Sequence, residues 1–386
     1  MRILFQYLTG GGGGLSNFIL LLQAISREYP EDHLDVACSQ SSGLYSLQSL
    51  PNVDVISLGS NRHQEIDRIV LGIGGLDRLA RDRHADVLWS LNLGSYVRTS
   101  VPQILSVNNP HQVYPWEVTR LHPDNFINVA AMRWFFRKSL AVSQGVIVQT
   151  PIMAEYIRNI GAYNEPIAVV PKAVENTTDV HPDPLPANVQ RSFSNGLGRE
   201  AFTFLYASTF TPHKNHKTLV EAFSILAEAG AKARVVLTIS PDELIACAGV
   251  KAQKLIDSGF LLPIGWIGKN HLKSLYDGCN ACLMPSLLES LSSAHLEAMQ
   301  WSKPQITADL PYARDLCGNA AEYVPADNPK AWAETIRKFM SNHARMADLI
   351  EKGHEQMKNF PPTWSAAAKQ VHGFIEKISG TLAATT

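Results

Sequence analysis

The chain of 386 residues lacks three features, and each absence argues against one class of protein or site. It has no basic surplus, since 34 Lys and Arg residues stand against 35 Asp and Glu residues, and this balance argues against a nucleic-acid binder. No apolar run reaches the roughly 18 residues that a membrane span needs. No Asp-x-Asp pair occurs, so the metal ion that such a pair would hold is not expected.

Cysteine is also scarce, with Cys38, Cys247, Cys279, Cys282 and Cys317 as the only five. An odd number of cysteines without a secretory signal is typical of a reducing cytosol, so a cytoplasmic protein is predicted. Cys279 and Cys282 form a Cys-x-x-Cys pair, which could be redox-active or supply half a zinc site. Because no second pair exists and this one enters an apolar strand, we interpret both as buried thiols.

The length and the 45% of apolar residues predict two or three domains with large cores. Residues 1–8 form an apolar strand, 9–14 a glycine-rich loop and 15–25 a helical pattern. A strand, a glycine loop and a helix in this order are typical of a doubly wound α/β domain, in which ligands bind beyond the carboxyl ends of the strands. The glycines would allow close approach of the backbone to a ligand, although a flexible linker is the alternative interpretation.

Short apolar segments then alternate with helical or loop sequence, which predicts parallel sheets covered on both faces. An aperiodic stretch near 175–199 predicts a linker, and we expect domains at 1–180 and 190–360. His111 follows one of the strands and could face a ligand, or it could be a turn histidine without chemistry. The predicted strands are 34–38, 53–57, 87–90, 103–107, 145–150, 166–171, 202–207, 234–239, 281–284, 303–307 and 321–324.

Residues 130–138 form a basic, aromatic helix with two interpretations. The helix could contact a membrane surface or a lipid-linked acceptor through its cations and aromatic rings. The preferred interpretation packs the aromatic rings on the sheet and leaves Arg133, Arg137 and Lys138 in solvent.

The stretch 284–299 is the most informative part of the chain, because it predicts a strand, a tight loop and a helix. A helix that begins near Ser292 would leave several backbone N–H groups free for an anion. Glu289 in the loop and Glu297 in the helix would repel a phosphate, but both can accept hydrogen bonds from sugar or ribose hydroxyls. A nucleotide-sugar would need this arrangement.

The two glutamates, eight positions apart, follow Pro-Ser and precede Glu-Ala-Met. This pattern resembles the donor-binding motif of the family 4 retaining glycosyltransferases of GT-B fold. The resemblance implies that Glu289 meets the donor sugar and Glu297 the nucleotide ribose. The loop differs from the family's Glu-Gly-Phe-Gly, but backbone amides are expected to hold the diphosphate. The donor-binding residues of this loop and of the start of the helix are Ser290, Leu291, Ser292 and Ser293.

The same resemblance assigns further residues. Lys214 matches the lysine of the family's Gly-Arg-x-x-x-x-Lys, whereas the family's arginine aligns with Thr209. Lys214 would therefore neutralise the leaving diphosphate together with helix N–H groups. Trp266 and Ile267 would lie against the nucleobase, although core packing explains them equally well. The loop glycines Gly11, Gly12, Gly13 and Gly14 would lie near the donor phosphate and acceptor.

The resemblance implies an α/β protein of GT-B fold, with two doubly wound Rossmann-like domains facing a central cleft and helix 364–386 crossing back to the first. It implies a retaining, metal-independent hexosyltransferase without a cofactor, with Glu289, Lys214 and His111 as catalytic residues. The expected donor is a UDP-sugar, UDP-glucose first as the commonest class, with GDP-mannose open. The expected acceptor is a glycan or lipid-linked molecule of polysaccharide or glycolipid synthesis, with peripheral contact at the inner membrane face.

Two alternatives stay open. A nucleotide-sugar epimerase of similar fold would need acid and base groups from both domains, and His111 with Glu289 is the only pair available to it. A catalytically degenerate nucleotide-sugar-binding subunit is the other alternative. Thr209 and Ala173 support it, because both replace residues that the family pattern favours.

Overall fold

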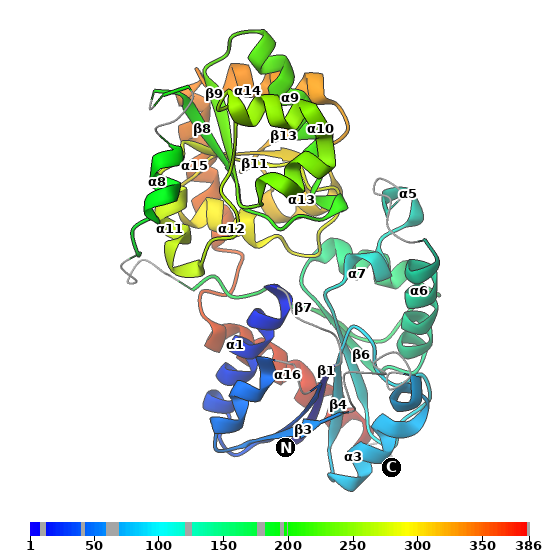
Figure 1. Cartoon of the computed structure of the whole chain (residues 1–386). Coiled ribbons are helices and arrows are strands. Elements are labelled where there is room, and N and C mark those ends of the chain that lie inside the picture. Colours follow the sequence, from blue (N-terminus) through cyan, green and yellow to red (C-terminus); the bar gives the residue numbers. More distant parts are fainter. Residues whose placement is uncertain are drawn as a thin grey trace. The chain divides into compact units, whose positions relative to one another are not determined.

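The computed structural model describes residues 1–7, 13–39, 43–58, 69–119, 126–175, 182–193, 197–198 and 200–383. The chain forms two compact units, each built on its own sheet (Figure 1). Unit 1 comprises Met1–Pro115, Asn125–Glu175 and Phe360–Thr386, and unit 2 comprises Trp116–Asp124 and Asn176–Asn359.

Unit 1 contains a seven-stranded parallel sheet in the order β3-β2-β1-β4-β5-β6-β7. The strand order reverses between β1 and β4, as in doubly wound folds. The strands are β1 (Arg2–Tyr7), β2 (His33–Cys38), β3 (Val53–Ser57), β4 (Val87–Leu91), β5 (Gln103–Val107), β6 (Gly145–Val148) and β7 (Ile167–Val169).

Helices cover both faces of this sheet, because successive side chains of a strand point to opposite faces. Ile3 and Phe5 of β1 pack in one core cluster with residues of α1 (Gly13–Glu28) and α16 (Trp364–Ala383). Leu4 between them packs in another cluster with α3 (Leu76–Asp82). The other helices are η1 (Gly43–Ser49), η2 (Leu71–Gly75), α4 (Pro110–Val113), α6 (Phe126–Ala141) and α7 (Pro151–Asn159).

The C-terminal helix α16 is part of the core of unit 1. Its Val371 and Ile375 are fully or nearly fully buried in the cluster that contains α1. His372 lies 2.5 Å from a carboxylate oxygen of Asp32 and stacks on Tyr29 with ring centroids 3.4 Å apart. These contacts join residues more than 300 positions apart in the sequence.

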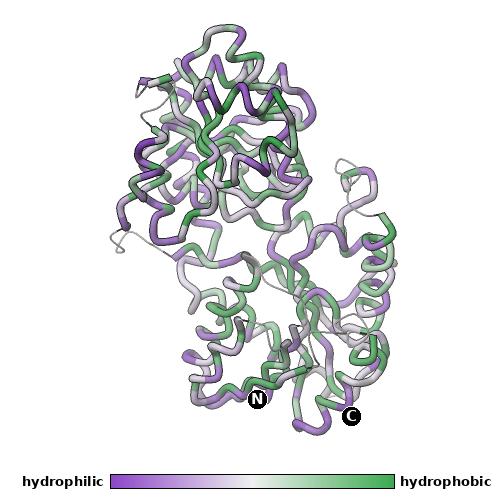
Figure 2. Tube along the Cα trace, in the orientation of Figure 1, coloured by the Kyte–Doolittle hydropathy of each residue, from purple (hydrophilic) through white to green (hydrophobic). Residues whose placement is uncertain are grey.

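Unit 2 contains a six-stranded parallel sheet in the order β10-β9-β8-β11-β12-β13, with its reversal between β8 and β11. Figure 2 shows hydrophobic residues along the strands of both units. The strands are β8 (Phe202–Tyr206), β9 (Ala233–Leu237), β10 (Leu261–Pro263), β11 (Ala281–Met284), β12 (Gln305–Ala308) and β13 (Glu322–Val324). The helices are α5 (Trp116–Thr119), α8 (Ala187–Ser192), η4 (Pro212–Lys214), α9 (His216–Glu228), α10 (Pro241–Asp257), α11 (Lys269–Asp277), α12 (Ser293–Gln300), α13 (Pro311–Cys317), α14 (Pro329–Phe339) and α15 (His343–Met357).

The predicted fold class is confirmed, and each predicted strand is present with ends that differ by at most two residues. The predicted linker near 175–199 contains the short helix α8, which sequence periodicity did not indicate. Cys279 and Cys282 are buried free thiols, as interpreted from their apolar surroundings. No helix of the described residues is both long enough and apolar enough to cross a bilayer.

The preferred interpretation of helix 130–138 is wrong in part. Arg133 is not in solvent but buried, and it donates hydrogen bonds to the carbonyl oxygens of His111 (2.7 Å) and Tyr114 (2.5 Å). Phe136 is buried, whereas Trp134 is 55% exposed. The helical pattern located α6, but hydrogen-bond acceptors from another segment decided which side chains are covered.

Candidate active site

The two loops predicted to bind a donor meet at one edge of the unit 2 sheet. Strands β8 and β11 are parallel, hydrogen-bonded neighbours, with Phe204 opposite Ala281. Lys214 follows β8 and Glu289 follows β11, so both lie beyond the carboxyl ends of adjacent strands. This is the point where the strand order reverses, which is where doubly wound sheets bind ligands.

Lys214 and Glu289 form an ion pair, with Nζ donating to Oε1. Only 17% of the lysine side chain and 12% of the glutamate side chain are exposed. Burial is the largest single influence and opposes the charge on each group, but the partner's charge and hydrogen bond together with smaller contributions outweigh it. The pKa of Lys214 is therefore raised and the pKa of Glu289 lowered, so both groups are ionised at neutral pH.

Asn215 fastens the Lys214 loop to the Glu289 loop. Its backbone is left-handed, with φ 55°, a conformation that asparagine tolerates better than most residues. Its side-chain amide donates to the carbonyl oxygens of Pro285 (3.2 Å) and Ala326 (3.0 Å). The backbone of Leu287 also donates to a carbonyl of the Lys214 loop, at 2.7 Å.

Tyr206 ends β8 beneath the ion pair and is almost fully buried. Its hydroxyl donates to the carbonyl oxygen of Lys214 (2.9 Å), so its 2.8 Å contact with Ser286 has the serine hydroxyl as donor. Tyr312 in turn donates to the Ser286 carbonyl oxygen (2.6 Å). Burial raises the pKa of Tyr206 to about 12, so the hydroxyl stays protonated and available as a donor.

Helix α12 begins where the sequence predicts, with Ser292 as its N-cap residue. The Ser292 side chain makes no capping hydrogen bond, and no acidic residue occupies the first turn. The first N–H groups of a helix have no acceptor within the helix, and they carry a partial positive charge. This end of α12 therefore suits an anion.

Glu297 lies in α12 and is half-buried. Its carboxylate accepts a hydrogen bond of 3.1 Å from the hydroxyl of Tyr276, a fully buried residue of α11. Burial, and then the charge of Glu297, raises the pKa of Tyr276 well above its ordinary value, so Tyr276 remains a donor. The second carboxylate of the motif is thus oriented by a neighbouring helix.

Two buried histidines also lie near the ion pair in this edge of the sheet. His216 Nε2 is 3.1 Å from the Ser208 hydroxyl, and His295 Nε2 is 2.9 Å from the Thr307 hydroxyl. Burial lowers the pKa of both histidines to about 4. Both rings are therefore neutral at physiological pH and suit orientation of neighbouring hydroxyls rather than charge.

The remaining predicted residues of unit 2 differ in exposure. Trp266 is 84% exposed on the loop after β10, whereas Ile267 packs against the hydrophobic core. Core packing therefore explains Ile267 but not Trp266. Thr209 is exposed on the loop after β8, at the start of the segment that leads to Lys214.

The predicted residues of unit 1 form a separate group. Gly11 and Gly12 lie outside the described residues, and Gly13 and Gly14 are the first residues of α1. His111 lies in α4, where its backbone N–H donates to the Asn109 side chain (3.1 Å). The structure therefore does not bring His111 into the unit that carries Lys214 and Glu289.

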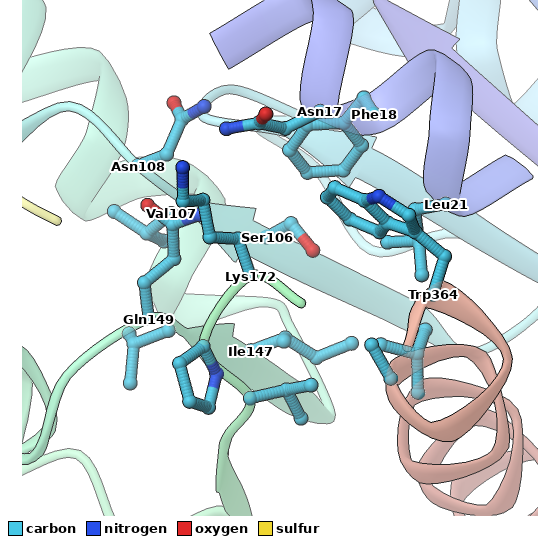
Figure 3. A pocket seen from close by; sticks show the side chains of 15 residues that line it. Asn17, Phe18, Leu21, Ser106, Val107, Asn108, Ile147, Gln149, Lys172 and Trp364 are labelled. Atoms are coloured by element: carbon cyan, nitrogen blue, oxygen red, sulfur yellow. The ribbon is translucent and has the colours of Figure 1, made fainter. Parts of the chain in front are cut away.

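Unit 1 contains a small cavity of about 40 Å³ beyond the carboxyl ends of β5, β6 and β7. Its walls are largely apolar, and Figure 3 shows the polar ends of Asn17, Asn108 and Lys172 gathered on one side of it. Sequence analysis missed this site, although polar residues directly after predicted strands were a usable signal. The lining residues are Asn17, Phe18, Leu21, Ser106, Val107, Asn108, Ile147, Val148, Gln149, Val170, Pro171, Lys172, Trp364, Ala367 and Val371.

One group of residues in the described parts of the chain has metal-ligating chemistry, namely His33, Asp35 and Asp54. Arg2 Nε lies 2.6 Å from Asp35, and Arg83 lies 2.7 Å from Asp35 and 2.9 Å from Asp54. Two guanidinium groups thus already neutralise the two carboxylates. We interpret the group as an ion-pair network at the edge of the unit 1 sheet.

Comparison with known proteins finds a family model that matches part of the chain. Residues 190–356 match the family model described as glycosyl transferases group 1. This match covers most of unit 2 and supports a glycosyltransferase. The matched region contains Lys214, Glu289 and Glu297, and it supports the family 4-like assignment that these residues indicated.

The chain also resembles curated proteins and solved structures. It is 22% identical over 275 residues to the O-antigen chain mannosyltransferase RfbU of Salmonella typhimurium, covering 67% of this chain and 69% of that protein. A sucrose-phosphate synthase of Thermosynechococcus elongatus matches with a TM-score of 0.76 and 14% identity over 98% of this chain and 99% of that one. HepE of Anabaena, in complex with UDP and glucose, matches with a TM-score of 0.69 and 15% identity over 98% and 100%. These structures establish the GT-B fold.

Proposed function

We propose that this glycosyltransferase moves a hexose from a nucleoside diphosphate sugar to a glycan or lipid-linked acceptor of polysaccharide or glycolipid synthesis, with retention at the anomeric carbon. The observation that carries the proposal is the Lys214–Glu289 ion pair at the reversal point of the unit 2 sheet, with Glu297 on the helix that follows.

Each group of the site suits one part of such a donor. Lys214 and the N–H groups at the start of α12 are the cationic elements, and they neutralise the diphosphate. Glu289 and Glu297 are acceptors, and they bind the hydroxyls of the sugar and of the ribose. Trp266 offers an exposed ring for the nucleobase.

The ion pair between Lys214 and Glu289 is exchanged for contacts with the donor when the donor binds. Without donor, Lys214 and Glu289 neutralise each other. A diphosphate competes for Lys214, and Glu289 then becomes free to accept hydrogen bonds from sugar hydroxyls. The charge of Lys214 therefore stabilises the diphosphate as negative charge develops on it.

The transfer needs no carboxylate nucleophile. The bond from the anomeric carbon to the diphosphate oxygen breaks, and the acceptor oxygen forms its new bond on the same face of the sugar. The acceptor proton passes to the departing phosphate oxygen. Lys214 and the α12 amides stabilise that oxygen, so the chemistry proceeds with neither a metal ion nor a cofactor.

UDP-glucose is the first donor that we propose, because HepE, a protein of the same fold, forms complexes with UDP and with UDP-glucose. GDP-mannose is the second, because the similar RfbU is described as a mannosyltransferase. We assign the acceptor to the cavity of unit 1. Its walls are largely apolar, and the polar ends of Asn17, Asn108 and Lys172 lie on one side of it (Figure 3).

A panel of nucleotide-sugars, each with and without glycan and lipid-linked acceptors, tests the proposal. We expect nucleoside diphosphate release that depends on the acceptor and persists in a metal chelator, with a product whose anomeric configuration by NMR equals that of the donor. Epimerisation of the donor without acceptor would support the epimerase alternative. Donor binding without turnover on any acceptor would support a degenerate binding subunit.

A further inference from the structure

The cavity beyond β5, β6 and β7 of unit 1 is small and has apolar walls. Its volume is about 40 Å³. At roughly 10 to 15 Å³ for each water, this is room for about three water-sized groups. Phe18, Leu21 and Trp364 line the cavity, and each is at most 9% exposed. Such a space suits a short substituent of a ligand, because a lipid chain would not fit.

Aromatic packing fixes one wall of the cavity. The Phe18 ring stacks on Phe5, with centroids 5.7 Å apart, and its centroid lies 6.1 Å from that of Trp89. Phe5 and Trp89 are both fully buried. The wall is therefore preformed, and a ligand does not have to pay for ordering it.

Ser106 supplies a hydrogen-bond donor inside the cavity. The residue is 4% exposed, and Figure 3 shows its hydroxyl turned toward Leu21 and Trp364. The hydroxyl oxygen accepts the indole N–H of Trp89 at 2.8 Å, which uses one of its lone pairs. Its own proton has no hydrogen-bond acceptor in the part of the chain that the structure describes. The Ser106 proton is therefore available to an oxygen of a ligand.

The polar side of the cavity carries two amide groups. The side chains of Asn17 and Asn108 lie there together with that of Lys172 (Figure 3). Neither asparagine side chain forms a hydrogen bond within the described residues, so each offers a carbonyl oxygen and an N–H donor. Among the described lining residues, Lys172 is the only charged one. The cavity thus combines an apolar interior, a buried hydroxyl donor and amide groups at its entrance.

We infer that this cavity is a subsite for an N-acetyl group on a sugar of the acceptor. The inference rests on the proposed function, which assigns the acceptor to unit 1. The acetyl methyl packs against Phe18 and Trp364, and the acetyl carbonyl oxygen accepts the Ser106 proton. The acetamido N–H donates to an asparagine carbonyl oxygen at the polar side. The acetyl methyl, carbonyl carbon and oxygen match a space for about three water-sized groups.

Other small substituents satisfy fewer of these groups. The methyl group of a deoxy sugar would fill apolar space but leave the Ser106 proton without an acceptor. An O-acetyl ester lacks the N–H that an asparagine carbonyl would accept. A carboxylate or phosphate would lose its hydration between apolar walls, and Lys172 would attract it to the polar side instead.

Calorimetric binding of methyl glycosides to the full-length protein, without donor, tests the inference. The probes are the methyl glycosides of N-acetylglucosamine and N-acetylgalactosamine, and methyl glucoside and methyl galactoside are the matched sugars without the acetamido group. We expect the acetamido glycoside of at least one configuration to bind about 10-fold to 100-fold more tightly than its match. The gain comes from a buried methyl group and added hydrogen bonds. A propionamido analogue should lose part of this gain, because its extra methylene overfills the cavity.

Three results overturn the inference. They are equal binding with and without the acetamido group, no binding of any probe, and tighter binding of methyl glucuronide than of the acetamido glycosides. The last result would assign the cavity to a carboxylate that pairs with Lys172.

A cavity-filling variant with a matched control locates the subsite. Ala367→Leu enlarges a side chain of α16 that lines the cavity, and it should abolish the preference for acetamido glycosides. Ala366→Leu makes the same change at the neighbouring half-buried position, which does not line the cavity, and should retain the preference. Ser106→Ala removes the buried donor and should reduce the preference about 3-fold to 10-fold. Circular dichroism confirms that each variant is folded, and a preference kept in both Ala367→Leu and Ser106→Ala refutes the subsite.

The binding result and the glycosyl-transfer result fail separately. An acetamido preference without turnover of any nucleotide-sugar would confirm the N-acetyl site and refute the proposed function. Turnover on acceptors without any acetamido preference would refute the N-acetyl site and leave the proposed function intact.

Discussion

Lys214 and Glu289 are 75 positions apart in the sequence, yet they form a largely buried ion pair. The pairing follows from the order of the unit 2 sheet, because β8 and β11 are neighbours although two β–α units separate them along the chain. A lysine after one strand and a glutamate after the other must then share the same sheet edge. The proposed donor site depends on this relationship.

Replacing Lys214 with Met should lower kcat/KM for donor turnover by a factor of about 100 to 1000, because one charge that stabilises the leaving diphosphate is lost. The measurement is nucleoside diphosphate release with a fixed acceptor. Lys217→Met, on the exposed side of α9, is the control and should retain activity.

Because Lys214→Met also leaves Glu289 without its partner, the protein should lose stability, by about 3 to 5 kcal/mol for a buried pair broken on one side. Lys214→Met/Glu289→Gln removes both charges, and it should recover much of that stability but none of the activity. If the double variant regained turnover together with stability, the role of Lys214 in catalysis would be refuted.

Replacing Glu297 with Ala should weaken the binding of the nucleoside diphosphate by about 10-fold to 100-fold, because a hydrogen bond to a charged acceptor is lost. Isothermal titration calorimetry with UDP and GDP measures it. Tyr276→Phe removes only the hydroxyl that orients Glu297 at 3.1 Å, so a smaller loss is expected. Glu334→Ala, on exposed α14, is the control, and unchanged affinity in Glu297→Ala would refute the ribose contact.

His216 and His295 should titrate near pH 4, since burial lowers their pKa values to about 4. The unfolded chain binds these protons near pH 6.5, so the free energy of unfolding should decrease as the pH falls from 6.5 to 4, by up to about 3 kcal/mol per histidine. NMR of the imidazole Cε1–H groups measures the pKa values, with His295→Gln to assign its signal. A midpoint above pH 6 for either ring would contradict the prediction.

Two replacements of Asn215 separate the contribution of its backbone conformation to stability from that of its side-chain hydrogen bonds. Asn215→Gly keeps the left-handed turn and removes the hydrogen bonds to Pro285 and Ala326, at a cost of about 1 to 3 kcal/mol. Asn215→Ala adds backbone strain of about 1 kcal/mol to that loss. Urea unfolding measures both variants. Equal stability of the alanine and glycine variants would show that the turn is not strained in alanine.

Substitutions in the cavity of unit 1 should affect the binding of the acceptor and not that of the donor. Asn108→Ala and Lys172→Met are expected to raise the KM of the acceptor by about 10-fold to 100-fold, while the KM of the donor stays unchanged. Lys369→Met, on the exposed side of α16, is the control. A changed donor KM with an unchanged acceptor KM would place the acceptor elsewhere.

The sequence by itself determined the elements of this protein. Short apolar runs located the strands, Ser292 marked the start of α12, and two glutamates at fixed spacing indicated the donor loop, because these signals are local and follow from backbone geometry. The resemblance to a known family then supplied the fold class.

Tertiary structure alone decided which distant side chains share an environment. Four features depend on segments that only strand order and helix packing bring together. They are the Tyr276–Glu297 hydrogen bond, the burial of Arg133, the contact of His372 with Asp32 and the unit 1 cavity. Periodicity in the sequence reports which side of an element is apolar, but it does not report which element packs on that side. Hydrogen-bond partners, burial and pKa shifts depend on that packing.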